Sequence, residues 1–309
     1  SRSSAASDVY KRQGLYSSAK EYVGWPITPG FEFSGRVSEI GAEVKDLKVG
    51  DEVVGVTLFG GYASEIVVPQ IQIFPRPPSL SMIELAAFPT VHLTAWYALR
   101  ELANVRPGRT ILVHSAAGGV GGALVQLGRI LGCRVVGVVG GTHKVSTALE
   151  FGCAEVIDKS KVNLWKEAER ISPEGYDVVL DANGVETLRQ SFKHLSSGGR
   201  LVVYGFHTMF SRDRGRPQWL KLASGLARTP LFSPLTMTND NKSVLAFNLS
   251  YLFDEMGLFR EAMGELFAYQ KDGQLIAPPI TTFPLRDAAE AHRALESGKS
   301  VGKLVLTTS

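Results

Sequence analysis

A glycine-rich turn between an apolar strand and an amphipathic helix, within residues 110–123, constrains the fold of this chain more than any other feature. The missing side chain of Gly118 lets the backbone approach a pyrophosphate, and that of Gly121 lets the helix pack closely on a sheet. The first amides of the helix are free to donate to an anion. We therefore predict a dinucleotide-phosphate site formed by Ala117, Gly118, Gly119, Val120 and Gly121.

The residues around this turn supply the strand-helix-strand context that such a motif requires. Leucines recur at helical spacing over residues 120–131, Gly132 ends that helix, and residues 134–139 are typical of a buried strand. Ala116 takes the place of the first glycine in G-x-G-x-x-G, so the pattern is degenerate. Glycines also form plain strand-to-helix turns, but the context favours cofactor binding over that alternative.

The end of the second strand indicates which cofactor is bound. A site for NADH normally has Asp or Glu there to hold the ribose 2′-hydroxyl, but this chain has Gly140 and Gly141. The two glycines leave room for a 2′-phosphate, and Lys144 and Lys159 can supply positive charge to it. The sequence therefore favours NADPH. The alternative is that Lys144 is only a solvated charge on a helix.

Two later strand ends complete the predicted cofactor site. Strands are expected at residues 155–157, 176–180 and 200–204, and Asn183 and Gly205 follow the last two of them. Ligands of open α/β sheets bind beyond the carboxyl ends of the strands. We therefore assign Asn183 and Gly205 to the nicotinamide side.

Composition excludes several classes of protein. The net charge of +3 gives no electrostatic footprint for nucleic acid. No apolar run is long enough for a transmembrane segment. The only cysteines, Cys133 and Cys153, are expected as free thiols in a reducing compartment, which predicts a cytoplasmic protein.

The order of expected elements predicts an α/β fold in two domains, a doubly wound parallel sheet of the Rossmann type plus an antiparallel β domain. Residues 1–13 have no apolar period and are interpreted as a non-native head. The β domain is expected over residues 14–105, and the nucleotide-binding domain over residues 106–273, with an insertion at 207–241 and late helices at 243–253 and 258–271. Residues 274–309 are expected to return to the β domain.

Several motifs together resemble one known family. They lie at residues 13–16, 29–37, 49–53, 60–64, 116–121, 198–200 and 301–306. The chain resembles the zinc-free quinone oxidoreductase and enoyl reductase branch of the medium-chain dehydrogenase/reductase superfamily, and is most similar to the synaptic vesicle membrane protein homologues. The resemblance implies a GroES-like β domain interrupted by a Rossmann domain, and a homodimer.

Two departures from the wider family pattern affect the chemistry and the fold. Zinc alcohol dehydrogenases have Gly-His-Glu where this chain has Phe31 between Gly30 and Glu32, and two cysteines cannot supply their other ligands. No metal is therefore expected. Family members also carry two further strands before the Gly-Leu-Tyr motif at residues 14–16, so the chain is expected to be truncated at its N-terminus, with an unpaired sheet edge.

The resemblance identifies two candidate catalytic residues, Tyr16 and Thr94. Tyr16 would donate a hydrogen bond to the substrate or stack on it, and its alternative is an ordinary tyrosine of the β domain. Thr94 would lie at the nicotinamide end, or could simply bond its own preceding helical turn. His92 is interpreted as structural, and His114 with Ser115 cannot form a nucleophile and base pair because adjacent strand residues face opposite sides.

These observations predict an NADPH-dependent reductase of a small-molecule substrate, a quinone or an α,β-unsaturated carbonyl compound. An enoyl-thioester reductase is the alternative enzyme. The alternative from another class is a weakly active nucleotide-binding protein that associates peripherally with a membrane surface or lipid. Residues 212–221, which mix arginine with tryptophan, favour that alternative.

Overall fold

The computed structural model describes residues 2–4, 17–206 and 228–308. The chain forms two compact units. The first unit combines Ser1–Leu93 with Leu249–Ser309, and the second unit is the continuous segment Thr94–Asn248. The predicted α/β fold with a doubly wound parallel sheet and a separate β domain is confirmed.

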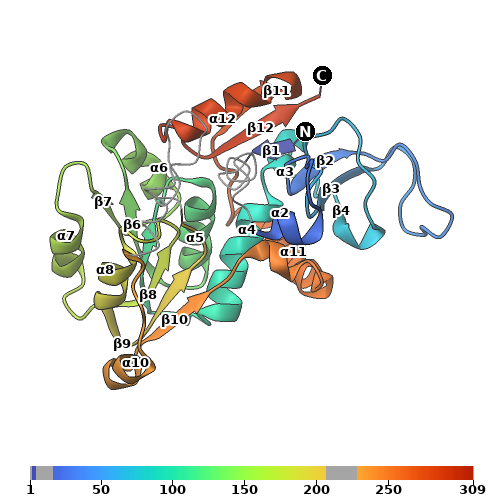
Figure 1. Cartoon of the computed structure of the whole chain (residues 1–309). Coiled ribbons are helices and arrows are strands. Elements are labelled where there is room, and N and C mark those ends of the chain that lie inside the picture. The colour runs from blue at the N-terminus through green and yellow to red at the C-terminus, as the bar shows by residue number, and fades with distance from the viewer. Residues whose placement is uncertain (1, 5–16, 207–227, 309) are drawn as a thin grey trace. The chain divides into compact units, whose positions relative to one another are not determined.

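A six-stranded parallel sheet forms the middle of the second unit (Figure 1). Its spatial order is β10-β9-β8-β5-β6-β7. The strands are β5 (Thr110–His114), β6 (Arg134–Val139), β7 (Glu155–Asp158), β8 (Tyr176–Asp181), β9 (Leu195–Val203) and β10 (Ser243–Ala246). The chain order reverses beside β5, and such a switch point is where open α/β sheets bind ligands.

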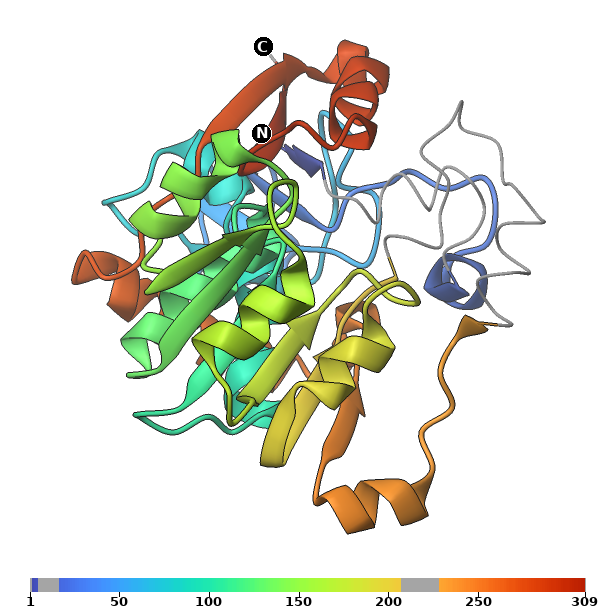
Figure 2. The ribbon, with the colours of Figure 1, turned by 90° about the vertical axis from the view of Figure 1, so that its left-hand side faces the viewer.

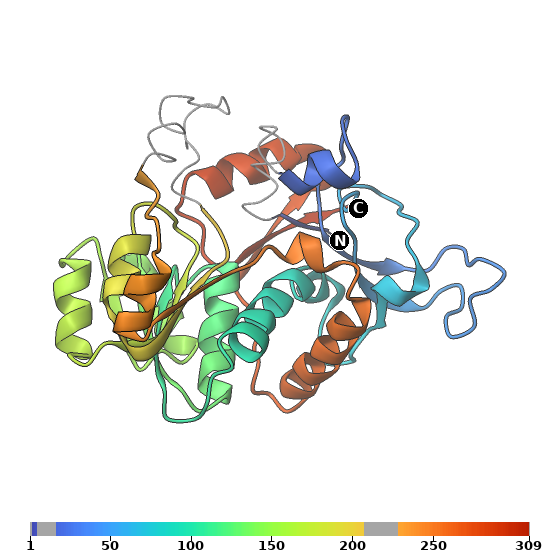
Figure 3. The ribbon, with the colours of Figure 1, turned by 60° about the horizontal axis from the view of Figure 1, so that its bottom comes forward.

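Helices cover both faces of this sheet (Figures 2 and 3). They are α5 (Gly119–Ile130), α6 (Val145–Glu150), α7 (Leu164–Ile171) and α8 (Leu188–Lys193), with the short η3 (Thr142–Lys144) before α6. Helix α10 (Pro234–Asp240) buries none of its residues and precedes β10. Helices α7 and α8 pack on one face, where Ala168 and Leu188 join a buried cluster with Val136 and Leu201. Helix α5 packs close to β5 and β6, since a Cβ at Gly128 would lie 2.6 Å from Ile111 Cδ1.

The first unit contains a second six-stranded sheet of order β11-β12-β1-β2-β3-β4. Its strands are β1 (Arg2–Ser4), β2 (Glu32–Arg36), β3 (Glu52–Val56), β4 (Ile73–Pro75), β11 (Ile280–Pro284) and β12 (Lys303–Thr307). All neighbours are antiparallel except β11 and β12, which are parallel, and β12 lies between β11 and β1 (Figure 1). The C-terminal residues therefore complete this sheet.

The helices of the first unit are short apart from one. They are α2 (Ser17–Tyr22), η1 (Gln70–Gln72), α3 (Met82–Ala86), α4 (Pro89–Trp96), η4 (Leu249–Leu252), α11 (Met256–Lys271), η5 (Leu285–Asp287) and α12 (Ala288–Glu296). Helix α4 extends into the second unit at Thr94, where the π-helical η2 (Tyr97–Leu102) follows it. No helix among the described residues is long and apolar enough to span a membrane.

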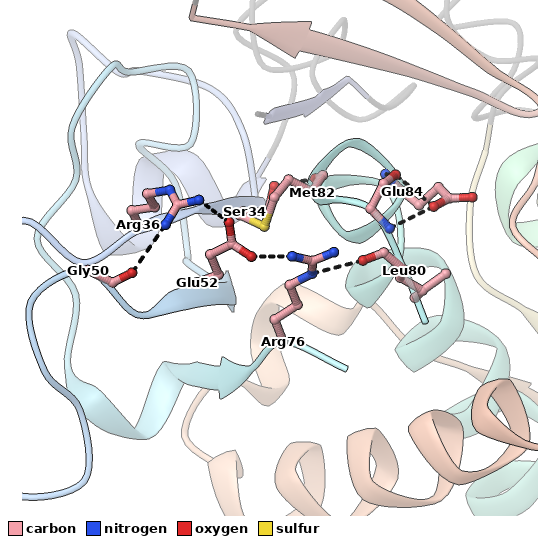
Figure 4. A network of polar contacts seen from close by, with 9 residues as sticks. Ser34, Arg36, Gly50, Glu52, Arg76, Leu80, Met82 and Glu84 are labelled. Carbon is pink, nitrogen blue, oxygen red and sulfur yellow. Dashed lines mark hydrogen bonds and ion pairs between the residues drawn. The ribbon is translucent and has the colours of Figure 1, made fainter. Parts of the chain in front are cut away.

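A network of charged and polar side chains joins the strands of the first unit to the segment before α3 (Figure 4). The Glu52 carboxylate pairs with Arg36 on β2 and with Arg76 beyond β4. Arg76 also donates to the carbonyl oxygen of Leu80 over 3.0 Å. Because both arginines stabilise the ionised carboxylate, the pKa of Glu52 lies below its usual range.

The unit borders differ from the sequence-based borders at residues 106 and 273. Helix α11 was expected in the nucleotide-binding domain, yet its contacts are with the first unit: the ring of Phe267 stacks on Phe88 with centroids 5.5 Å apart, and Arg260 bonds the carbonyl oxygen of Ile73 at 3.4 Å. Packing of an amphipathic helix is set by its long-range partners, which local patterning does not identify.

Two further expectations differ from the structure. Residues 243–253 were predicted as a helix, but they form β10 and η4, because the short apolar run pairs in parallel with β9. Residues 1–13 were predicted to lie outside the fold with an unpaired sheet edge, but Arg2–Ser4 form β1 between β12 and β2. Residues 5–13, and residues 207–227 of the predicted insertion, lie outside the described part of the chain.

Candidate cofactor site

The turn between β5 and α5, residues 115–118, is closed by its own backbone and leaves the helix start without a side-chain cap. Ser115 adopts a φ of 58°, and its carbonyl oxygen accepts from the amide of Gly118 over 2.8 Å. Gly118 is the residue before the helix and offers no capping side chain. The amides of Gly119, Val120 and Gly121 begin the helix, where no intrahelical acceptor exists for them. This arrangement fits a pyrophosphate.

The glycines of this turn have different structural roles. A Cβ at Gly121 would lie 2.0 Å from the carbonyl oxygen of Ser115, so only glycine fits there. A Cβ at Gly118 would meet the same oxygen at 3.2 Å, and its φ of −87° is open to other residues. Gly121 is therefore required by the packing of the turn, whereas the packing requires Gly118 much less.

The next two strands bring Gly140 and Lys159 together. β6 and β7 pair with Val139 opposite Asp158, and the amide of Lys159 bonds the carbonyl oxygen of Val139 at 3.1 Å. The Lys159 side chain passes over Gly140, since a Cβ there would lie 3.8 Å from Lys159 Cε. The exposed Lys159 ammonium thus belongs to the edge where the 2′-phosphate is predicted.

Gly141 and Lys144 form the turn that leads from β6 into α6. The amide of Lys144 bonds the carbonyl oxygen of Gly141 at 3.0 Å, and Lys144 is the half-buried residue before α6. The positive charge of Lys144 therefore lies at the N-terminal end of α6 rather than along its exposed side. This position is compatible with the predicted phosphate contact.

Sequence reasoning missed a carboxylate at this edge, that of Asp158. It accepts from Thr142 Oγ1 over 2.6 Å and from the amide and hydroxyl of Ser160 over 3.0 and 2.6 Å. Hydrogen bonds from Ser160 and Thr142 lower its pKa. The acid comes from the third strand of the motif rather than the second, so a search of the β6 end alone does not find it.

Asn183 and Gly205 lie where the strand ends of β8 and β9 meet. Asp181 pairs with Val203 across these strands, and the amide of Tyr204 bonds the carbonyl oxygen of Asp181 at 3.1 Å. Asn183 is buried, in the β8–α8 loop, residues 182–187. The predicted cofactor residues from Ala117 to Gly205 therefore follow β5, β6, β7, β8 and β9 at one edge of one parallel sheet.

The structure describes one of the two predicted catalytic residues. Thr94 is a buried residue of α4, and Tyr16 lies outside the described residues. His92, on the same helix, has its Nδ1 2.7 Å from the carbonyl oxygen of Phe88 and stacks on the Phe88 ring. Burial lowers the pKa of His92 to about 4, so the ring is neutral at pH 7.

Phe31 occupies an apolar environment. Its ring packs against Phe59 with centroids 5.2 Å apart. The neighbouring Glu32 is buried and engaged by Lys303 Nζ at 2.9 Å and by the amide of Thr90 at 2.8 Å. Within the described residues, no group of three His, Cys, Asp or Glu side chains could hold a metal ion.

Comparison with protein families gives two matches. Residues 3–78 match the alcohol dehydrogenase GroES-like domain, and residues 151–306 match the zinc-binding dehydrogenase family. Phe31 lies within the first of these matches and outside the second.

Comparison with curated proteins gives VAT-1 homologues and a quinone oxidoreductase-like protein among the relatives of this chain. The synaptic vesicle membrane protein VAT-1 homolog of Homo sapiens is 32% identical over 303 residues, covering 97% of this chain and 75% of that protein. The chain spans only 61% of the Danio rerio VAT-1 homolog, which is also 32% identical. Quinone oxidoreductase-like protein 2 homolog of Nematostella vectensis is 31% identical, over 97% of this chain and 78% of that protein.

Solved structures similar to this fold include a quinone oxidoreductase and an enoyl reductase. The quinone oxidoreductase of Escherichia coli complexed with NADPH has a TM-score of 0.84 and 28% identity, covering 99% of this chain and 88% of that one. The CurK enoyl reductase has a TM-score of 0.82 and 28% identity, covering 97% of this chain and 87% of that one.

Proposed function

Because this chain belongs to the medium-chain dehydrogenase/reductase superfamily, we propose that it is an NADPH-dependent oxidoreductase that transfers hydride to quinones or α,β-unsaturated carbonyl compounds without zinc. The observation that carries the proposal is the meeting of five strand ends at one sheet edge. The glycine turn after β5, Gly140 after β6 and Lys159 after β7 together supply an anion cradle and a positive charge beside it.

The proposed roles of the residues at this edge follow from their chemistry. The bound cofactor supplies the hydride. The amides of Gly119–Gly121 bind and orient the pyrophosphate, and Lys159 and Lys144 pair with the 2′-phosphate. Asn183 and Gly205 border the nicotinamide end. The protein thus contributes position and electrostatics to the reaction.

Charge stabilisation at the substrate is the second part of the proposal. Hydride addition to an electron-poor carbon places negative charge on a carbonyl oxygen, where a hydrogen-bond donor lowers the barrier most. We assign that donor to Tyr16 or Thr94, whose hydroxyl groups need no metal. Phe31 supports a zinc-free site because an apolar ring cannot be a ligand.

An enoyl-thioester reductase is the second candidate activity. The likeness to the CurK enoyl reductase favours it, and the same hydride chemistry serves an α,β-unsaturated thioester. The VAT-1 homologues favour the third candidate, a nucleotide-binding partner at a membrane surface. We also propose that the protein is a homodimer, which the family resemblance supports. A cytoplasmic location is proposed from the free thiols of Cys133 and Cys153.

One experiment separates these candidates. NADPH binding is measured by isothermal titration, and NADPH oxidation is then followed over a panel of quinones, enones and enoyl thioesters. We expect binding together with turnover of quinones or enones. Turnover of thioesters alone would move the assignment to the second candidate. NADPH binding without any turnover, combined with co-sedimentation of the protein with anionic lipid vesicles, supports the third candidate. A lack of NADPH binding contradicts all three.

A further inference from the structure

Three buried side chains connect the strand that enters the β5–α5 turn with the strand that enters the β8–α8 loop. His114 ends β5, Asp181 ends β8, and Ser191 lies on α8. Their exposed fractions are 1%, 0% and 0%. His114 Nε2 lies 3.2 Å from Ser191 Oγ, and Ser191 Oγ donates to Asp181 Oδ2 over 2.7 Å.

The hydrogen bonds among His114, Ser191 and Asp181 allow only one assignment of donors and acceptors. Ser191 has a single hydroxyl proton and gives it to the carboxylate, so its oxygen can only accept from His114. His114 must therefore carry its proton on Nε2. Burial lowers the pKa of His114 in spite of the nearby Asp181, which keeps the ring neutral at pH 7.

This order excludes the nucleophilic chemistry that a Ser, His and Asp cluster suggests. In a hydrolytic triad the serine donates to the histidine, which in turn donates to the carboxylate. Here the serine donates to Asp181 and accepts from His114, so the histidine cannot take the proton of the serine as it does in a triad. The cluster is arranged to hold structure.

The second carboxylate oxygen of Asp181 holds the β8–α8 loop. Oδ1 accepts from the amide of Asn183 over 2.8 Å, from the amide of Gly184 over 3.3 Å and from Thr187 Oγ1 over 3.0 Å. One carboxylate therefore bonds the loop that carries Asn183 and, through Ser191, the strand that begins the glycine turn. An anion this deeply buried is stable only when its donors are all in place.

We propose that Asp181 is a positioning residue that, through Ser191 and His114, keeps the β8–α8 loop in register with the β5–α5 turn, so that both ends of the cofactor bind at once. This role rests on the proposed cofactor site. It adds no group to the reacting atoms. Its effect is on affinity for the dinucleotide.

The hydrogen-bond order is tested first, on protein without cofactor. In Asp181→Asn, the amide Oδ1 can keep its three donors while Nδ2 donates to Ser191 Oγ, which then donates to His114. The proton of His114 should move from Nε2 to Nδ1. Nitrogen-15 NMR of the imidazole distinguishes the two tautomers. An unchanged tautomer in a folded variant would overturn the proposed link.

Cofactor affinity is tested with Ser191→Ala, which removes the hydroxyl that bridges Asp181 and His114 and leaves His114 Nε2 3.7 Å from Asp181 Oδ2. Tyr176→Phe is the matched control, because Tyr176 is equally buried at the opposite end of β8, where its hydroxyl donates to the carbonyl oxygen of Ala168 over 2.8 Å. We expect both variants to melt at lower temperature than the wild type. Only Ser191→Ala should weaken NADPH binding, by about tenfold, which corresponds to about 1.4 kcal/mol.

The outcomes separate the two proposals. If Ser191→Ala and Tyr176→Phe bind NADPH as the wild type does, the positioning role is wrong and the proposed function stands. If the wild type itself binds no NADPH, the proposed function fails and the positioning role fails with it. Should Ser191→Ala not fold, Ser191→Cys replaces it, because a thiol is only a weak donor and acceptor: normal NADPH affinity of that variant contradicts the positioning role.

Discussion

Gly121 faces the carbonyl oxygen of Ser115 so closely that a Cβ at position 121 would lie 2.0 Å from that oxygen. Three residues earlier, a Cβ at Gly118 would lie 3.2 Å from the same atom. The packing of this turn therefore requires glycine at position 121. At position 118 a Cβ would need only a small shift of its neighbour. The difference allows structural and binding roles to be separated by mutation.

The first prediction compares these two glycines. Gly118→Val should weaken NADPH binding more than tenfold with a small change in thermal stability, because its branched side chain occupies the approach of the phosphate. Gly121→Ala should instead destabilise the protein by about 2 kcal/mol, since the helix must shift away from Ser115. Titration and thermal melts check both. Normal NADPH binding by Gly118→Val would place the phosphate site elsewhere.

The second prediction concerns cofactor choice. Wild-type protein should bind NADPH more tightly than NADH, and Lys159→Ala and Lys144→Ala should each narrow that difference by removing charge from the 2′-phosphate. Lys166→Ala, an exposed lysine on α7, removes the same charge and should leave the ratio unchanged. Equal affinity of the wild type for both cofactors would refute the assignment.

The third prediction concerns metal. Reductase activity should survive prolonged treatment with a chelator, because Phe31 stands in the ligand position and packs on Phe59. Elemental analysis of the purified protein should find no stoichiometric zinc. One tightly bound zinc ion per chain, removed by the chelator together with the activity, would contradict the zinc-free mechanism.

The fourth prediction concerns acid stability through His92. Its folded pKa of about 4 lies below its ordinary value of 6.5, so below pH 6.5 the unfolded chain binds a proton that the folded chain does not. The contribution of His92 to stability is therefore full above pH 6.5, falls between pH 6.5 and about 4, and changes no further below, a loss on the order of 3 kcal/mol.

His92→Phe, which keeps a ring stacked on Phe88, should reduce this loss. Urea unfolding at pH 7 and pH 5 measures the difference for both proteins. His114 is also buried with a lowered pKa and continues to contribute in the variant, so the acid sensitivity should shrink without vanishing. An identical loss in both proteins would show that His92 is not the titrating group.

The sequence predicted the local geometry of the strands and turns that carry the proposed cofactor site. The β5–α5 turn, the end of β6 at Gly140 and the strands that follow are each set by glycines and apolar runs within a few residues. The sequence did not predict the contact of Asp158 with Thr142 or that of His114 with Ser191. The paired residues are 16 and 77 positions apart in the chain. Patterning specifies faces and turns, while such pairs appear only when the strand order is known.

The pairing of β12 with β1 has a consequence for synthesis of the chain. The second unit is one continuous segment, so all its strands have been synthesised before Leu249 is added, and it can fold before the first unit is complete. The first unit must wait, because β12 lies between β1 and β11 and residues 303–307 are made last among its strands. Until then β1 and β2 of the nascent chain expose unpaired backbone that pairs readily with other chains. A chaperone bound to these strands would increase the fraction of chains that fold correctly.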